Sequence, residues 1–265
     1  MYKPELIVFG AGNDDLRASG IRLANQSEHL GWFDRVHLFD ETSLDKDYYD
    51  TFFQFDPSES KGFGYWSWKL FLIRRVYAVL SQGDTLVYLD AGCELNARGA
   101  GRFNEYIAHS QLHGAAIFQL PHLARSWTKY HPMLDFGSHY TDRLQVVGGV
   151  LFVTKSAKAS RLLDRWWELA THEGGLLLMD PLPNEPQRPD FQQHRHDQSL
   201  LSWAVYEAGI PTIPDETYFD DWRQGITKPI LTLRNKTGEP RLEFLLRPRW
   251  QRKLLRLVGK EPGRR

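Results

Sequence analysis

Short apolar runs alternate with segments of helical spacing along the first half of the chain. Residues 5–10 (ELIVFG) form an apolar run that ends in glycine, which is typical of a buried strand. Residues 14–30 carry apolar side chains three and four positions apart, which predicts a helix, and Gly31 follows as its C-terminal cap. Residues 35–39 (RVHLF) form a second apolar run. A strand, a helix and a strand in this order predict a parallel sheet with a right-handed crossover.

This alternation continues as far as residue 213. Residues 43–62 are polar, acidic and aromatic, which indicates a helix followed by a loop. Residues 122–142 lack a regular period, and residues 174–193 contain four prolines, which is typical of a loop or a lid. The chain is therefore predicted to be an α/β protein, in which a mostly parallel central sheet is flanked by helices in three Rossmann-like layers. The remaining periodic segments predict helices over 65–80, 103–109, 157–172 and 196–208, and strands over 85–89, 114–120, 145–154 and 210–213.

The composition is that of a soluble globular protein, with 42% hydrophobic and 25% charged residues. The formal net charge is zero, whereas proteins that bind nucleic acid usually carry a basic surplus, so we expect no nucleic-acid partner. The charge is unevenly distributed, because residues 241–265 contain nine Lys or Arg and only two Glu. We expect a single domain over residues 1–240, followed by a basic tail over residues 241–265.

The tail combines basic and apolar side chains. Residues 247–260 contain six Lys or Arg together with Trp250 and several leucines. A basic amphipathic helix with a tryptophan is typical of a segment that lies on anionic lipid. The alternative is a helix that packs on the body of the protein and keeps its basic face in solvent. We expect an anionic membrane surface to be a partner of the tail.

Cys93 is the single cysteine of the chain, which excludes an intrachain disulfide and fits a reducing compartment. No stretch approaches the ~20 consecutive apolar residues that a membrane-spanning helix needs. Residues 1–4 lead directly into the first predicted strand, without the apolar region and cleavage site of a signal peptide. We therefore expect a cytoplasmic protein that binds peripherally at the inner face of the membrane.

Two acidic residues follow the predicted strand over residues 85–89, in the order Asp90-Ala-Gly-Cys-Glu94. The carboxyl ends of parallel strands form the ligand crevice of open α/β sheets. Carboxylates there suit Mg²⁺ or Mn²⁺, which can neutralise a leaving diphosphate. Gly92 leaves room for a diphosphate beside the backbone. The alternative is a simple turn in which Asp90 caps the next segment.

Two segments around this acidic pair resemble a known family. Residues 62–69 (GFGYWSWK) and residues 83–94 (GDTLVYLDAGCE) are similar to bacterial polysaccharide glycosyltransferases of the GT-A, or nucleotide-diphospho-sugar transferase, superfamily. The resemblance implies a GT-A-like fold and transfer of a sugar from a nucleotide-diphospho-sugar donor to a cell-surface glycan or lipid-linked acceptor. It also implies Mn²⁺ or Mg²⁺ held by Asp90 and Glu94, in a variant of the D-x-D motif. Gly92 stands where the second acid of a standard D-x-D would be.

Two later segments extend the resemblance. Residues 145–155 (QVVGGVLFVTK) are similar to the strand of small residues that passes under the donor sugar in such enzymes, which implies that Gly148 and Gly149 bind the donor. Residues 194–198 (HRHDQ) resemble the D-Q motif at a helix start in glycogenin-like transferases. This implies a donor contact for Gln198 and a catalytic or acceptor-binding role for Asp197, for which a general base is one option. The alternative for Asp197 is a helix N-cap.

Several other residues are candidates for the same site. Lys69 follows an aromatic loop and could contact the diphosphate, or it could be a solvated helix lysine. Trp66 and Trp68 are candidates for binding the acceptor or the sugar, but side chains two positions apart face different sides of a helix, so we expect at least one in the core. His196 is a candidate for acceptor binding. The alternative for at least one of His194 and His196 is a solvated loop histidine.

The first loop, residues 10–15 (GAGNDD), invites comparison with a dinucleotide-binding motif. It lacks the third glycine, and two acids at a helix start would repel pyrophosphate, so we exclude nicotinamide cofactors. Asp14 is a candidate for binding the donor base or ribose, and helix capping is its alternative role. Two other functions remain open, a sugar nucleotidyltransferase and a catalytically inactive glycan-binding module.

Overall fold

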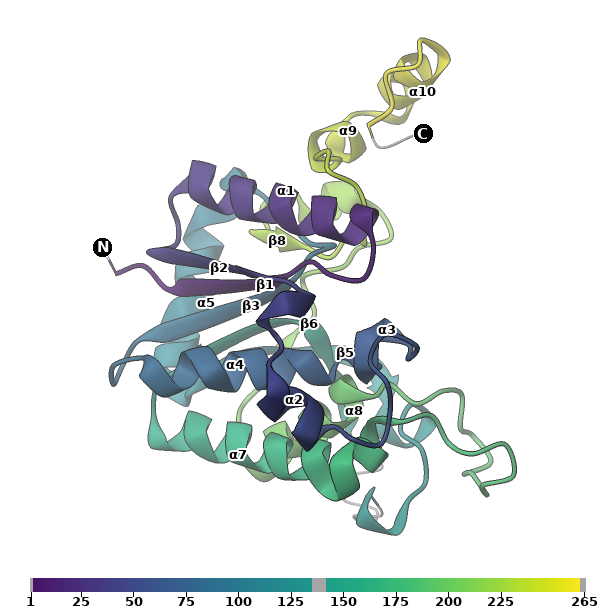
Figure 1. Cartoon of the computed structure of the whole chain (residues 1–265). Helices are drawn as coiled ribbons and strands as arrows, with labels where there is room; N and C mark the ends of the chain where they lie inside the picture. The colour runs from purple at the N-terminus through teal and green to yellow at the C-terminus, as the bar shows by residue number, and fades with distance from the viewer. Residues whose placement is uncertain (1, 135–141, 263–265) are drawn as a thin grey trace.

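A six-stranded mixed sheet forms the centre of the molecule (Figure 1). The computed structural model describes residues 2–134 and 142–262. The strand order is β2-β1-β3-β6-β5-β7, and within this sheet β6 alone of the described strands runs antiparallel to its neighbours. The prediction of a mostly parallel sheet is therefore confirmed. The strands are β1 (Glu5–Phe9), β2 (Arg35–Phe39), β3 (Thr85–Asp90), β5 (Ala115–Leu123), β6 (Leu144–Thr154) and β7 (Ile213–Pro214).

Helices cover both faces of this sheet, as the alternation of side chains along the strands requires. Leu6 and Val8 of β1 belong to one buried cluster, which also contains residues of α1 and α5. Ile7 and Phe9 belong to the opposite cluster, with residues of α4, α7 and α8. Figure 1 shows the three layers. The helices are α1 (Asp14–Leu30), α2 (Lys46–Thr51), α3 (Gly62–Tyr65), α4 (Ser67–Val79), α5 (Ala100–His113), α7 (Ala157–Thr171), α8 (Asp197–Glu207), α9 (Leu242–Leu246) and α10 (Arg249–Leu257).

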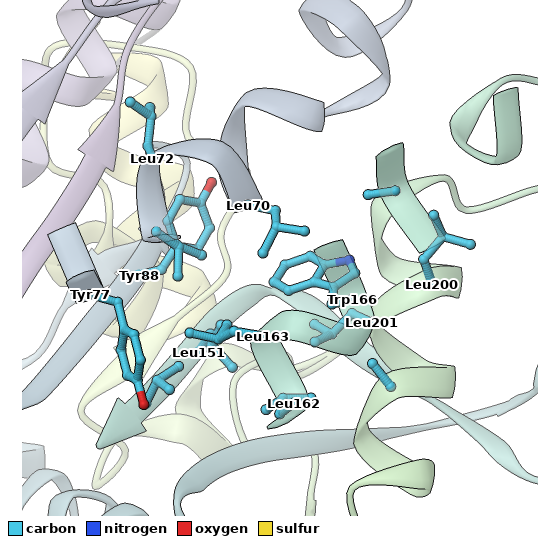
Figure 2. Close-up of a cluster of buried hydrophobic side chains, with 14 of the residues drawn as sticks. Leu70, Leu72, Tyr77, Tyr88, Leu151, Leu162, Leu163, Trp166, Leu200 and Leu201 are labelled. Carbon is cyan, nitrogen blue, oxygen red and sulfur yellow. The ribbon is translucent and has the colours of Figure 1, made fainter. Parts of the chain in front are cut away.

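Trp166 anchors the core on the face covered by α4, α7 and α8 (Figure 2). Its side chain is fully buried among leucines of these helices, and its indole nitrogen donates to the Asp197 carbonyl at 3.1 Å. This bond ties the first residue of α8 to the middle of α7. Packing on this face therefore fixes where Asp197 lies.

The ends of several elements differ from the prediction. The helix predicted over residues 65–80 is interrupted at Trp66, whose left-handed φ of 61° separates α3 from α4. The strand predicted over residues 210–213 is β7 at 213–214. A 3₁₀ helix over residues 172–178 follows α7 directly and extends into the loop predicted over residues 174–193, and its two glycines, Gly174 and Gly175, have positive φ. The 3₁₀ helices are η1 (Glu41–Ser43), η2 (Ala97–Gly99), η3 (Ala124–Ser126), η4 (Pro132–Leu134), η5 (His172–Leu178) and η6 (Trp222–Gly225).

The C-terminal part of the chain returns to the sheet before it leaves the body. A two-stranded sheet pairs β4 (Glu94–Leu95) with β8 (Ile230–Leu231). Beyond it, α9 packs on the body through Leu242 and Phe244, whereas no residue of α10 is buried. Figure 1 shows α10 standing away from the sheet. Among the described residues, no helix combines the length and the apolar character that crossing a bilayer requires.

Candidate active site

The loops at the carboxyl ends of β1 and β3 border a cavity of about 1280 Å³. Its wall contains the loop after β1, the loop after Asp90, and residues from segments 215–220 and 232–236. A second cavity of about 280 Å³ adjoins it, and Asp90 lines both. Ligand crevices of open α/β sheets lie at this edge. These two cavities therefore form the candidate active site.

Asp90 ends β3 and projects a 45% exposed side chain into both cavities. Its Oδ1 accepts a hydrogen bond from the Tyr88 hydroxyl at 2.6 Å. Gly149 on the neighbouring strand faces the other oxygen, and a Cβ built there would lie 2.5 Å from Asp90 Oδ2. The glycine at 149 therefore makes room for this carboxylate.

Lys69 links Asp90 to Asp197. Its Nζ donates to Asp197 Oδ2 at 2.6 Å and to the Gly148 carbonyl at 2.9 Å, and it lies 3.7 Å from Asp90 Oδ1. Both side chains of the Lys69–Asp197 pair are buried, which excludes the alternative of a solvated helix lysine. Asp197 is the first residue of α8, and its capping role is not observed, because His196 occupies the N-cap position.

Burial sets the proton affinities of this pair. Desolvation raises the pKa of Asp197 to about 6, against the opposing effect of the Lys69 ammonium. Burial alone would lower the pKa of Lys69, but the charges of Asp197 and Asp90 outweigh it and raise that pKa. At neutral pH the site therefore contains one ammonium between two carboxylates.

Gln198 and Gly148 pack against each other beside this cluster. A Cβ at Gly148 would lie 3.1 Å from the Gln198 Cβ, and the Gln198 side-chain nitrogen donates to Gln145 Oε1 at 2.7 Å. Both residues line the two cavities. The structure thus brings together predicted residues from four segments of the sequence, Lys69, Asp90, Gly148, Gly149, Asp197 and Gln198.

The two histidines before α8 are buried, so the solvated-loop alternative is wrong for both. His194 accepts from the Lys129 amide at 3.2 Å and donates to the Leu177 carbonyl at 2.9 Å. His196 has a left-handed φ of 49° and donates through Nδ1 to the Leu178 carbonyl at 2.7 Å. Burial lowers the pKa of both imidazoles, so they are neutral. Both line the smaller cavity, where the Nε2 of His196 makes no hydrogen bond and lies 3.6 Å from Asp180 Oδ1.

Trp66 and Trp68 have different environments. Trp66 is half-buried, lines both cavities and stacks on His196 with ring centroids 5.4 Å apart. Trp68 is buried, stacks on Phe9 at 3.9 Å and donates through its indole nitrogen to the Gly62 carbonyl. The prediction that at least one of them lies in the core is confirmed by Trp68.

Comparison with known proteins identifies the fold. No protein-family model matches the sequence, and no curated protein sequence does. Among solved structures, apo mouse xyloside xylosyltransferase 1 is 14% identical, with 90% of this chain and 100% of that chain covered and a TM-score of 0.50.

The chain has the GT-A glycosyltransferase fold. Two further similar structures have lower TM-scores. One is a glycosyltransferase involved in glycosylation of the major capsid of PBCV-1, at 12% identity, 91% and 96% coverage and a TM-score of 0.45. The other is the galactosyltransferase LgtC with donor and acceptor sugar analogs, at 9% identity, 81% and 75% coverage and a TM-score of 0.43.

Within this GT-A fold, Glu94 does not point into the site, and its prediction as a metal ligand is wrong. Its side chain is fully buried. The carboxylate accepts hydrogen bonds from the Asn235 side chain at 2.6 Å and from the amides of Arg241 and Leu242 at 2.9 Å. The Arg22 guanidinium lies 4.0 Å away. Glu94 therefore binds residues 235–242, which follow β8, to the loop after β3.

The structure also contradicts the prediction that Asp14 binds the donor base or ribose. Its side chain is fully exposed in the first turn of α1, 3.4 Å from Arg17, and it is not among the residues that line the cavities. The preceding residue, Asn13, lines the larger cavity and caps α1 by accepting from the Leu16 amide at 2.9 Å. Asp14 instead complements the positive end of the helix dipole.

The residues around Asp90 do not fit the metal site that the family resemblance implies. With Glu94 buried elsewhere, Asp90 is the single carboxylate of the motif, and one of its oxygens is already bonded to Tyr88. A side chain at position 92 would meet the backbone of Arg234, because a Cβ there would lie 3.1 Å from the Arg234 Cα. Within residues 2–134 and 142–262, no three His, Cys, Asp or Glu side chains converge as metal ligands do. At phosphate-binding Mg²⁺ sites the protein supplies one or two carboxylates and the other oxygen ligands come from water and phosphate; here Asp90 alone would supply the protein ligand in place of the implied pair.

Sequence reasoning missed three basic residues at the site. Arg195, Arg234 and Lys236 line the larger cavity, and the two arginines also line the smaller one. Arg195 lies between His194 and His196 in the sequence. Arg234 and Lys236 lie in a short irregular stretch with no periodicity. The available signal was two cations in a segment of residues 231–237 that contains no acid.

Proposed function

We propose that the protein is a glycosyltransferase that moves a sugar, of hexose type, from a nucleotide-diphospho-sugar donor to a cell-surface glycan or a lipid-linked acceptor. The observation that carries the proposal is the Lys69 ammonium between Asp90 and Asp197 where the two cavities meet. A buried charged cluster of this kind, at the carboxyl edge of a sheet and beside a cavity, is typical of a catalytic site.

The two cavities suit the two parts of a donor. The larger one, bordered by the loop after β1, has room for a nucleotide and an acceptor. The smaller one is lined by Trp66, His196, Asp197 and Gln198, which offer an aromatic face and several hydrogen-bonding groups of the kind that bind a sugar. The diphosphate would then lie at the junction, beside Asp90.

Transfer breaks the bond between the anomeric carbon and the diphosphate oxygen, and the electron pair leaves with the diphosphate. The acceptor hydroxyl oxygen forms the new bond to that carbon and loses its proton. A carboxylate is required close to the reacting atoms, either to take the proton or to stabilise positive charge on the sugar. We assign this role to Asp197, which Lys69 holds in its ionised form.

The test is turnover of a panel of UDP-, GDP-, CDP- and dTDP-sugars, measured as release of nucleoside diphosphate with and without oligosaccharide acceptors. Asp197→Asn should lower kcat by at least about 100-fold, the range typical of a lost acid–base group. Asp164→Asn is the matched control, because Asp164 is an exposed residue of α7 that pairs with Arg74.

Other outcomes would assign one of the alternative functions. Binding of a sugar without turnover of any donor would indicate the inactive glycan-binding module. Release of pyrophosphate from a nucleoside triphosphate and a sugar phosphate would indicate the nucleotidyltransferase. Unchanged turnover in Asp197→Asn would remove Asp197 from the mechanism.

We also propose that α10 attaches the enzyme to an anionic membrane surface. The side chains of Trp250, Leu254 and Leu257 are 66%, 55% and 76% exposed and lie on one side of the helix, at intervals of four and three residues. The positions between them include Arg252, Lys253 and Arg256. A lipid-linked acceptor would be presented at such a surface.

A further inference from the structure

The segment after β8 lies directly over the acidic motif. The Asn235 amide donates to the Gly92 carbonyl at 3.0 Å, and the Arg234 Cα is the nearest atom to the place where a side chain at position 92 would begin. This is the position that the second acid of a D-x-D motif would occupy. In this chain no acidic side chain occupies that position. Residues 232–237 pass over Gly92 instead, and this crossing segment carries two cations, Arg234 and Lys236.

A buried polar scaffold holds this segment in place. Arg22 donates to the carbonyls of Ala91 and Cys93 at 2.7 and 3.0 Å, and to that of Thr237 at 3.1 Å. Ser19 and Glu94 bind the backbone and the side chain of Asn235. These bonds join α1, the loop after β3 and the crossing segment from three distant parts of the sequence.

Arg234 has a backbone conformation that a side-chain-bearing residue seldom adopts. Its φ is +53°, in the left-handed region that favours glycine. Strained residues of this kind persist where the surrounding structure fixes them, and they concentrate at ligand sites. The scaffold around Asn235 supplies that fixation, and the consequence is an arginine that lines both cavities.

Arg195 and Arg234 line both cavities, and Lys236 lines the larger one. None of the ion pairs found among the described residues involves Arg195, Arg234 or Lys236. The Arg195 guanidinium is held 4.2 Å above the Trp127 ring. Burial and then the charge of Arg234 lower the pKa of Arg195, which shows that the two arginines repel each other. An anion between them would relieve this repulsion.

We propose that Arg195, Arg234 and Lys236 bind the donor diphosphate and neutralise it on departure, in the role that a divalent cation has at a two-carboxylate motif. Arginine suits this role because its planar guanidinium pairs with two phosphate oxygens at once. Cations fixed in advance around a leaving phosphate stabilise the charge that develops there. This inference rests on the proposed function and specifies how the same site holds its donor.

The experiment measures binding of UDP, GDP, CDP and ADP to the full chain by calorimetry, once in EDTA and once with MnCl₂. We expect the preferred nucleoside diphosphate to bind in EDTA, with a Kd that MnCl₂ changes less than threefold. Arg234→Ala should weaken binding about 10- to 100-fold, as expected for the loss of one charge-assisted pair. Arg161→Ala, an exposed arginine of α7, is the control and should leave the Kd unchanged.

A second variant distinguishes the role of the Arg234 side chain from that of its backbone conformation. Arg234→Gly removes the guanidinium and suits the left-handed conformation, so it should melt no lower than the parent protein while losing the same affinity. Binding that requires MnCl₂ and survives both Arg234 substitutions would overturn the cationic site and leave the proposed function intact. Absence of nucleoside diphosphate binding under every condition would overturn the proposed function itself.

Discussion

Lys69 determines the charge state of the site, because its ammonium lies within 4 Å of both carboxylates. Without it, two acids at the end of β3 and the start of α8 would repel each other and favour a shared proton. With it, Asp197 remains ionised at neutral pH although it is buried. The residue that sequence reasoning assigned to the diphosphate is thus placed to position the two carboxylates.

The pH dependence of activity follows from Asp197. Its pKa of about 6 means that protonation removes the carboxylate as the pH falls below 6. We expect kcat/KM to fall about tenfold per pH unit below that value, because one proton inactivates the group. A pH–rate profile from pH 4.5 to 8 measures this. A flat profile down to pH 5 would contradict the assignment.

The contribution of Asp197 to the free energy of unfolding should rise as the pH falls, whereas kcat/KM should decrease. The folded protein binds a proton at Asp197 between pH 6 and the ordinary carboxyl pKa of 3.8, whereas the unfolded chain does not. The contribution of this group to the free energy of unfolding therefore rises as the pH falls through that window. Comparing denaturant titrations of the parent protein and Asp197→Asn at pH 4.5 and 7 isolates this contribution, which the variant should lack.

Gly149 offers a test at the scale of one methyl group. An alanine there would place its Cβ 2.5 Å from Asp90 Oδ2, so the carboxylate must move. We expect Gly149→Ala to lower kcat/KM about 100-fold, since a displacement of about 1 Å beside the reacting atoms has an effect of this size. Gly101→Ala on α5 is the control, because nothing lies within 4 Å of its Cβ. Equal activities would show that Asp90 needs no fixed position.

At the scale of elements, apolar periodicity predicted the order of strands and helices well, because burial on both faces of the sheet imposes it. It also placed Asp90 and Asp197 at element ends and Gly149 inside a strand, and the fold brings these three residues together. It failed for Glu94, since an acid four residues after Asp90 looks the same whether it binds a metal or a distant backbone. The partners of Glu94 lie more than 140 positions away in the sequence.

The structural role of Glu94 predicts a stability effect without any metal. In Glu94→Gln an amide group replaces one oxygen that accepts from backbone N–H groups, which leaves a buried donor facing donors. We expect a loss of roughly 1–3 kcal/mol in the free energy of unfolding in EDTA, as for an unsatisfied buried polar group. Glu243→Gln is the control, because Glu243 is an exposed partner of Arg98. A metal ligand would show no such loss in EDTA.

At the scale of the whole molecule, the active site and the tail are parts of one continuous segment. Residues 232–236 line the larger cavity, Glu94 binds the amides of Arg241 and Leu242, and α9 and α10 follow immediately. A surface bound by α10 would therefore lie on the side of the molecule from which the crossing segment emerges (Figure 1). The sequence predicts a tail over residues 241–265 but not this connection, because irregular segments carry no periodic signal.

The apolar face of α10 gives the last prediction. Trp250 and Leu254 are exposed, and basic side chains surround them, so the full chain should sediment with vesicles of phosphatidylcholine and phosphatidylglycerol and not with phosphatidylcholine alone. Replacing both by serine should abolish sedimentation, whereas Leu112→Ser, which alters an exposed leucine of α5, should not. Because exposed charges are screened by salt, 0.5 M NaCl should weaken binding of the parent protein. Sedimentation of the double variant with anionic vesicles would show that another surface binds lipid.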